Sequence, residues 1–241
     1  MKNNFNELAV CKKMEEVTSQ EKASIHCRCG AVQILFTSKS PRAAVECCDK
    51  QSYNNLKFLA QMGDYELPEK FPVLVYFFDN KLVVVKGIEN LSFSKLIVES
   101  NLVNMYSSCC HTFLMSRNPA FAHSTVSVHG DRSYLSNVVH QKPTLRFFPD
   151  QLSEDDRTQL VHRIPGVWKD TKDRFRGDCD GWEEVYREFL ENVAAPIAEN
   201  QEGLPIEEIL QENSEPIFVL GWQSARFARK TVSKYECILS G

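Results

Sequence analysis

The sequence predicts an α+β protein in which a strand-rich N-terminal half precedes a helical C-terminal region. In the first half, β-branched and aromatic residues form short runs separated by turn residues, which is typical of strands. Beyond about residue 117, apolar residues recur at three- and four-residue spacing after helix-capping residues. We therefore divide the 241 residues into a polar leader at 1–22, a β domain at 23–116 and a mainly helical region at 117–241. The helical region is expected to pack on the β domain or to form a small second domain.

The N-terminal half contains five runs with the composition of strands. These are residues 31–37, 72–78, 81–86, 92–98 and 102–106. Asp79 and Asn80 separate the second run from the third, and both residue types tolerate the positive φ of a tight turn. The spacing predicts a β-hairpin over 72–86.

The C-terminal region contains three predicted helices. The strongest pattern begins after Asp180, a capping residue, and ends before Pro196. Its apolar face is formed by Trp182, Val185, Tyr186, Phe189, Leu190 and Val193. A shorter helix is expected to begin after Ser153 and to run toward Arg163, and a third is expected over 205–211.

Charge and hydropathy argue against two classes of partner, nucleic acids and membranes. The chain has 28 Lys and Arg against 32 Asp and Glu, so it lacks the basic field that holds nucleic acid or an anionic membrane. Its apolar runs are far shorter than the roughly 20 residues of a membrane span. The polar leader also lacks the apolar stretch of a signal peptide. We expect a soluble intracellular protein, cytoplasmic, with no nucleic-acid and no membrane partner.

The chain contains nine cysteines, which without an export signal favour metal ligands or free thiols over disulfides. Three are isolated, namely Cys11, Cys179 and Cys237, and these are expected to be buried thiols. The other six form the pairs Cys27 and Cys29, Cys47 and Cys48, and Cys109 and Cys110. The pairs are the part of the pattern that indicates a metal.

Cys27 and Cys29 are predicted to bind zinc together. In an extended segment residues i and i+2 point the same way, so both sulfurs can reach one ion. Zinc takes four ligands in a tetrahedron, and the remaining ligands must come from elsewhere. Cys109 and Cys110 are one source, and Cys47 and Cys48 are another. His26 and His111 flank the pairs and are expected to orient sulfurs or to face solvent rather than to bind the ion.

Three segments resemble the glutathione-dependent formaldehyde-activating enzyme and centromere protein V family. They are His26-Cys-Arg-Cys-Gly-Ala-Val32, Val45-Glu-Cys-Cys-Asp-Lys-Gln-Ser-Tyr53 and Met105-Tyr-Ser-Ser-Cys-Cys-His-Thr112. The last segment is most similar to an uncharacterised branch of that superfamily with a Cys-Cys-x-Thr motif. The resemblance covers roughly residues 24–116. It implies a zinc-pinned β-tent fold.

The resemblance also implies ligands. In the family's enzymes an early C-x-C and a late C-x-x-C hold a structural zinc, which correspond here to Cys27, Cys29 and Cys110. Ser107 occupies the other late position, so the fourth ligand is expected to be Cys109, Cys48 or Cys47, in that order. The family's catalytic zinc is held by a central C-x-C-x-x-C, but Lys50 and Tyr53 stand where two of those cysteines are expected.

Three functions are therefore weighed. The first is a non-catalytic or diverged zinc protein. The second is a carbon–sulfur lyase that acts on a glutathione–aldehyde adduct, with Cys47 and Cys48 as catalytic candidates and Lys50 lowering a thiol pKa. The third is a redox-responsive module in which oxidation of the paired thiols ejects the zinc.

Overall fold

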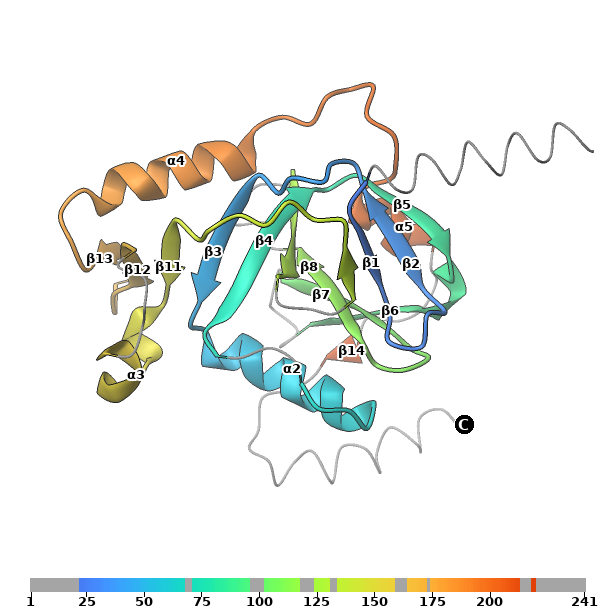
Figure 1. Cartoon of the computed structure of the whole chain (residues 1–241), viewed down its shortest axis with the longest axis horizontal. Helices are drawn as coiled ribbons and strands as arrows, with labels where there is room; N and C mark the ends of the chain where they lie inside the picture. Colours follow the sequence, from blue (N-terminus) through green and yellow to red (C-terminus); the bar gives the residue numbers. More distant parts are fainter. Residues whose placement is uncertain are drawn as a thin grey trace, which may run out of the picture.

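The chain folds into two β-sheets with helices around them (Figure 1). The computed structural model describes residues 22–67, 71–95, 102–117, 124–130, 134–158, 164–172, 174–212 and 218–219. The predicted α+β class is confirmed, with more sheet than helix among these residues. No helix in the described ranges is long and apolar enough to cross a membrane.

The smaller sheet has four strands in the order β10-β1-β2-β5. Neighbouring strands are antiparallel throughout. Their bounds are β1 Ser24–His26, β2 Gln33–Phe36, β5 Leu82–Lys86 and β10 Leu135–Ser136.

The larger sheet has ten strands in the order β13-β12-β11-β3-β4-β9-β8-β7-β6-β14. It is antiparallel from β3 to β6, whereas β11 lies parallel to both β3 and β12, and β14 lies parallel to β6. The strands are β3 Ala43–Cys47, β4 Val73–Asp79, β6 Leu91–Lys95, β7 Val103–Ser107, β8 Phe113–Arg117, β9 Thr125–His129, β11 Leu145–Phe147, β12 Gly166–Lys169, β13 Phe175–Gly177 and β14 Phe218–Val219.

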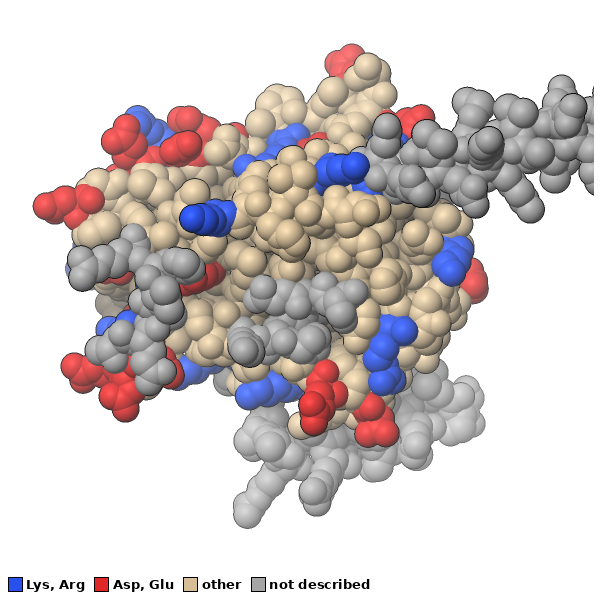
Figure 2. All heavy atoms as spheres, viewed as in Figure 1, with Lys and Arg blue, Asp and Glu red and all other residues tan. Residues whose placement is uncertain are grey.

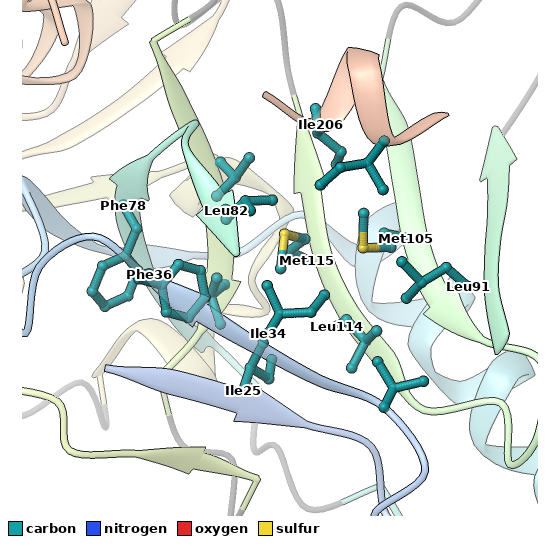
Figure 3. Close-up of a cluster of buried hydrophobic side chains, with 14 of the residues drawn as sticks. Ile25, Ile34, Phe36, Phe78, Leu82, Leu91, Met105, Leu114, Met115 and Ile206 are labelled. Carbon is teal, nitrogen blue, oxygen red and sulfur yellow. The ribbon is translucent and has the colours of Figure 1, made fainter. Parts of the chain in front are cut away.

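The main core lies between the two sheets (Figure 3). Ile25 and Ile34 of the smaller sheet pack in one cluster with Met105 and Met115 of the larger. Phe36 stacks on Phe78 across the sheets, with ring centroids 4.3 Å apart. Burial of this apolar surface is the main force that holds the sheets together.

In the part of the chain that the structure describes, four α-helices surround the sheets: α2 Lys50–Met62, α3 Glu154–Thr158, α4 Trp182–Ala194 and α5 Ile206–Glu212. The 3₁₀ turn η1 at Ile88–Asn90 connects β5 to β6, and η3 at Pro149–Gln151 connects β11 to α3. Leu56 and Leu59 of α2 pack on Tyr106 and Phe113. Phe189 of α4 packs on Phe77 of β4 and on Phe147 of β11.

The predicted helices at 153–163, 180–196 and 205–211 correspond to α3, α4 and α5. Ser153 begins α3 as expected, since its hydroxyl accepts a hydrogen bond from the Asp156 N–H at 3.1 Å. The described part of α3 ends at Thr158, and residues 159–163 lie outside the described ranges. Gly181, rather than Asp180, directly precedes α4, with a positive φ of 80°.

The predicted hairpin over 72–86 is wrong. β4 pairs with β3 and β9 in the larger sheet, whereas β5 pairs with β2 in the smaller one. The reason is that β4 is buried on both faces: Phe78 faces the smaller sheet and Phe77 faces α4. Asn80, itself buried, binds the start of α5 instead of forming a two-residue turn.

Two further differences concern secondary structure. The sequence pattern did not predict α2. The first half of this helix is mostly polar, so the apolar residues that form its buried face show no clear helical spacing. Among the described residues after 117, strands β9 to β13 lie beside the helices, and the sequence pattern did not predict these strands. β9 pairs with β4 and β8, so one sheet is built from both sides of residue 116. Strands as short as β11 and β12 show no alternation that a sequence pattern could reveal.

Candidate metal centre

Two turns bring four cysteine sulfurs together. Cys27 and Cys29 lie between β1 and β2, and Cys109 and Cys110 lie between β7 and β8. All four sulfurs lie within 4.8 Å of one another. Individual Sγ–Sγ distances are 3.5 Å for Cys27 and Cys29, 3.3 Å for Cys29 and Cys109, and 3.8 Å for Cys27 and Cys109.

These distances fit a tetrahedral metal site. Metal–sulfur bonds of about 2.3 Å place the sulfurs about 3.8 Å apart at the corners of a tetrahedron. A disulfide would need about 2.05 Å, and all four cysteines are free thiols. The residues present can therefore hold one ion with four sulfur ligands.

The first turn is formed by the sequence Cys-Arg-Cys-Gly. The Gly30 N–H donates to the Cys27 carbonyl at 2.9 Å, and the Cys27 N–H donates to the Val32 carbonyl at 3.1 Å. Gly30 has a positive φ of 73°, which glycine adopts without steric cost. The Val32 N–H also donates to the Cys27 sulfur at 3.2 Å, so the turn fixes the position of this sulfur.

The second turn is held by two buried hydroxyls. Ser107 Oγ and Thr112 Oγ1 lie 3.3 and 3.1 Å from the Cys110 sulfur. Burial raises the pKa of the Cys110 thiol, but hydrogen bonds with Ser107, Thr112 and Cys29 outweigh it and lower the pKa to about 6. The pKa of Cys109, whose side chain is only partly desolvated, is instead raised to about 12, by this desolvation and by hydrogen bonds with Cys29 and Cys27.

The two turns are linked directly, because the Arg28 N–H donates to Thr112 Oγ1 at 3.1 Å. The segment after α2 supports both turns. Arg28 Nη2 donates to the Gly63 carbonyl at 2.8 Å, and its guanidinium lies 5.0 Å from the centre of the Tyr65 ring. The Tyr65 hydroxyl donates to the His111 carbonyl at 3.1 Å.

The cluster has a buried side and an exposed side. Cys27 and Cys110 are buried, whereas Cys29 and Cys109 are exposed. An ion bound here would therefore be anchored in the core and reachable by small molecules at the surface.

The structure does not bring Cys47 and Cys48 into this group. Cys47 ends β3, and the Cys48 N–H donates to the Phe147 carbonyl at 2.9 Å. Burial raises the pKa of both thiols to about 12. The expected lowering by Lys50 is therefore not found. Lys50 is exposed and begins α2.

The flanking histidines do not join the group either. His26 Nδ1 lies 3.2 Å from the Cys27 carbonyl oxygen, and the His111 ring stacks on Tyr106. Cys179 was expected to be buried, but it is exposed in the loop before α4, where acidic neighbours surround it. Cys11 and Cys237 lie outside the described residues.

Sequence reasoning missed the roles of Ser107, Thr112 and Tyr65. Ser107 was interpreted only as a lost ligand position, yet its hydroxyl contacts the Cys110 sulfur. The Ser-x-x-Cys-x-Thr spacing was the available signal, since small hydroxyl residues near a ligand sulfur often orient it.

The comparisons with known proteins add little to this geometry. No protein-family model matches the chain, and no curated protein matches it. One solved structure with local similarity is described as the crystal structure of a Rhodobacter sphaeroides protein from a structural genomics programme. It is 17% identical, with a TM-score of 0.30, and the match covers 48% of this chain and 90% of that one. This TM-score is too low to support an argument about fold or function.

Proposed function

We propose that this chain is a zinc-binding protein in which Cys27, Cys29, Cys109 and Cys110 hold one structural zinc ion. The observation that carries the proposal is the convergence of four cysteine sulfurs within 4.8 Å. A ligand set made only of thiolates favours zinc among the common structural ions. Four protein ligands leave no position for water or substrate, so the ion would stabilise the fold rather than catalyse a reaction.

The same proposal includes the zinc-pinned β-tent fold and the relationship to the formaldehyde-activating enzyme superfamily. The position of the cysteines supports the zinc-pinned fold, because an ion bound to them would join the β1–β2 turn of the smaller sheet to the β7–β8 turn of the larger sheet. The three cysteine-containing segments within 24–116 are the sequence basis of this relationship.

Metal analysis of the purified full-length chain tests the proposal. We expect about one zinc ion per chain in the wild type, as in other four-cysteine structural sites. Cys29→Ser and Cys109→Ser should lose most of it, whereas Cys48→Ser and the exposed control Cys179→Ser should keep it. Two ions per chain, or loss of zinc in Cys48→Ser, would overturn the single structural site. A chain that purifies with no zinc and takes up none would overturn the proposal entirely.

The lyase alternative has less support. An open catalytic zinc needs three protein ligands, and the four-sulfur group is the one cluster of metal-ligand side chains found among the described residues. Thiols with a pKa of about 12 are also poor nucleophiles at neutral pH. Turnover of S-hydroxymethylglutathione that disappears in Cys48→Ser would favour the lyase over the structural site.

One observation favours a redox response as a second candidate function. Cys29 and Cys109 are both exposed, and their sulfurs are 3.3 Å apart. Cysteines bound to a metal are thiolates, so hydrogen peroxide would oxidise Cys29 and Cys109 of the zinc-bound protein to a disulfide while the peroxide is reduced to water, and the metal would lose two ligands. A zinc indicator should report release on mild peroxide treatment and rebinding after addition of a thiol reductant. Retention of zinc under these conditions would contradict the response.

A further inference from the structure

A cavity of about 220 Å³ lies on the outer face of the larger sheet, away from the four-sulfur group. Its walls include Val75 and Phe77 of β4, which point away from the core between the sheets. Leu56 and Leu59 of α2 close another side. None of the four clustered cysteines lines it, so the cavity is a separate feature of the molecule.

Polar side chains from three consecutive strands converge on this cavity. Asn104 lies on β7, Ser116 on β8, and Ser127 and His129 on β9. Asn104, Ser116 and His129 are buried, with exposed fractions of 6%, 9% and 9%. The Ser116 and Ser127 hydroxyls are 2.7 Å apart and hydrogen-bond to each other.

Four polar side chains close together are unusual on a sheet face that only packs against helices. Burying a polar side chain costs about 1–3 kcal/mol unless hydrogen bonds compensate it, so faces that only pack against helices are normally apolar. Elsewhere on the same face, β3 and β4 present Val45, Val73 and Phe77. A few polar groups gathered inside an apolar wall are typical of ligand sites.

The lining also defines the charge of a suitable ligand. Among the described lining residues there is no lysine or arginine, and Asp49 is the one carboxylate. Asp49 already accepts a hydrogen bond from the Ser52 hydroxyl at 2.6 Å. Burial raises the pKa of Cys47, which also lines the cavity, to about 12, so its thiol is neutral at physiological pH. An anionic ligand would therefore find no lysine or arginine among these residues to pair with.

The volume defines the size of the ligand. An engineered apolar cavity of about 150 Å³ accommodates benzene, so about 220 Å³ suits a single ring with two or three further heavy atoms. The rings of Phe77, Phe113 and Phe147 line the walls and favour an aromatic or similarly flat apolar body.

We propose that this cavity binds a small uncharged molecule with an apolar, ring-sized body and one hydroxyl or carbonyl group, which hydrogen-bonds to one or two of the polar side chains Asn104, Ser116, Ser127 and His129. The binding is reversible and non-covalent. It does not depend on the metal proposed for the cysteine cluster.

Titration of the full-length protein with benzyl alcohol, followed by amide NMR spectra, tests this inference. We expect a Kd of about 1 mM or tighter, which is reasonable for a ligand with eight heavy atoms. Shifts should concentrate on β7, β8 and β9. Toluene lacks the hydroxyl and benzoate is charged, so both should bind at least about tenfold more weakly, the cost of about one hydrogen bond or of an unpaired charge.

A filled-cavity variant localises the binding. Ser127→Leu places extra volume in the cavity and should weaken benzyl alcohol at least about tenfold, whereas Ser136→Leu, a half-buried serine of β10 outside the lining, should not. Asn104→Leu serves as a second variant if Ser127→Leu fails to fold. Absence of shifts in the wild type, equal binding by Ser127→Leu, or toluene binding as tightly as benzyl alcohol would overturn the proposal. A crystal soaked in benzyl alcohol that retains only ordered water in the cavity would overturn it too.

Discussion

At the scale of single residues, Thr112 connects the two cysteine turns through one buried hydroxyl. Its Oγ1 accepts a hydrogen bond from the Arg28 N–H and contacts the Cys110 sulfur. Its own N–H donates to Ser107 Oγ at 3.1 Å. Thr112 therefore aligns a backbone amide from one turn with a sulfur from the other, and any ion at the cluster depends on this alignment.

Replacing Thr112 with valine keeps the shape of the side chain and removes the hydroxyl. We expect Thr112→Val to weaken zinc binding about 10- to 100-fold, because residues that orient metal ligands have effects of this size. Thr112→Ser keeps the hydroxyl and is the matched control, with affinity close to the wild type. Competition against a chromophoric zinc chelator measures both. Equal affinities for the two variants would show that the hydroxyl has no such role.

At the scale of elements, the connection between β4 and β5 moves the chain from one sheet to the other. Asn80 is 1% exposed and follows β4 directly. Its Oδ1 accepts a hydrogen bond from the Ile206 N–H at 2.8 Å, and its Nδ2 donates to Glu207 at 2.9 Å. Asn80 thus satisfies a backbone donor at the start of α5, as a helix cap does, although it lies far away in the sequence.

Removing this side chain should destabilise the fold. Asn80→Ala removes the bonds to the buried Ile206 N–H and to the Glu207 carboxylate. We therefore expect the free energy of unfolding to fall by about 2–4 kcal/mol. Asn90→Ala is the matched control, because its Nδ2 bonds an exposed glutamate, and it should change stability by less than about 0.5 kcal/mol. Urea denaturation measures both variants. Similar values for the two would contradict the capping role of Asn80.

At the scale of the whole molecule, an apolar core lies between the two sheets (Figure 3). At one end of it, a turn from each sheet brings the four cysteine sulfurs together. On the face shown in Figure 2, the basic and acidic side chains among the described residues are interspersed over a largely uncharged surface. This agrees with the small net charge of −4.

Removal of the metal should therefore loosen the contact between the sheets. If the proposed zinc ion adds several kcal/mol to the free energy of unfolding, chelation should lower the Tm by about 10 °C or more. In a chain of this size, each kcal/mol lost lowers the Tm by about 2–4 °C. Differential scanning calorimetry before and after chelator treatment measures this. Re-added zinc should restore the Tm, and magnesium should not. In Cys109→Ser the Tm should already be low and should not respond to the chelator; a full response there would contradict the assignment of Cys109.

The sequence by itself determined the α+β class, the three C-terminal helices, and the turn that presents Cys27 and Cys29 together. These features are local, because a helix shows its period along the chain and the Cys-x-Cys-Gly turn contains its own geometry. Only the tertiary structure decided that Cys109 joins the sulfur cluster while Cys47 and Cys48 do not. It also decided that β4 and β5 belong to different sheets, and that polar residues from three strands meet in one cavity. Strand partners and cavity walls depend on contacts between residues far apart in the chain, and a single sequence contains no period or spacing that reports them.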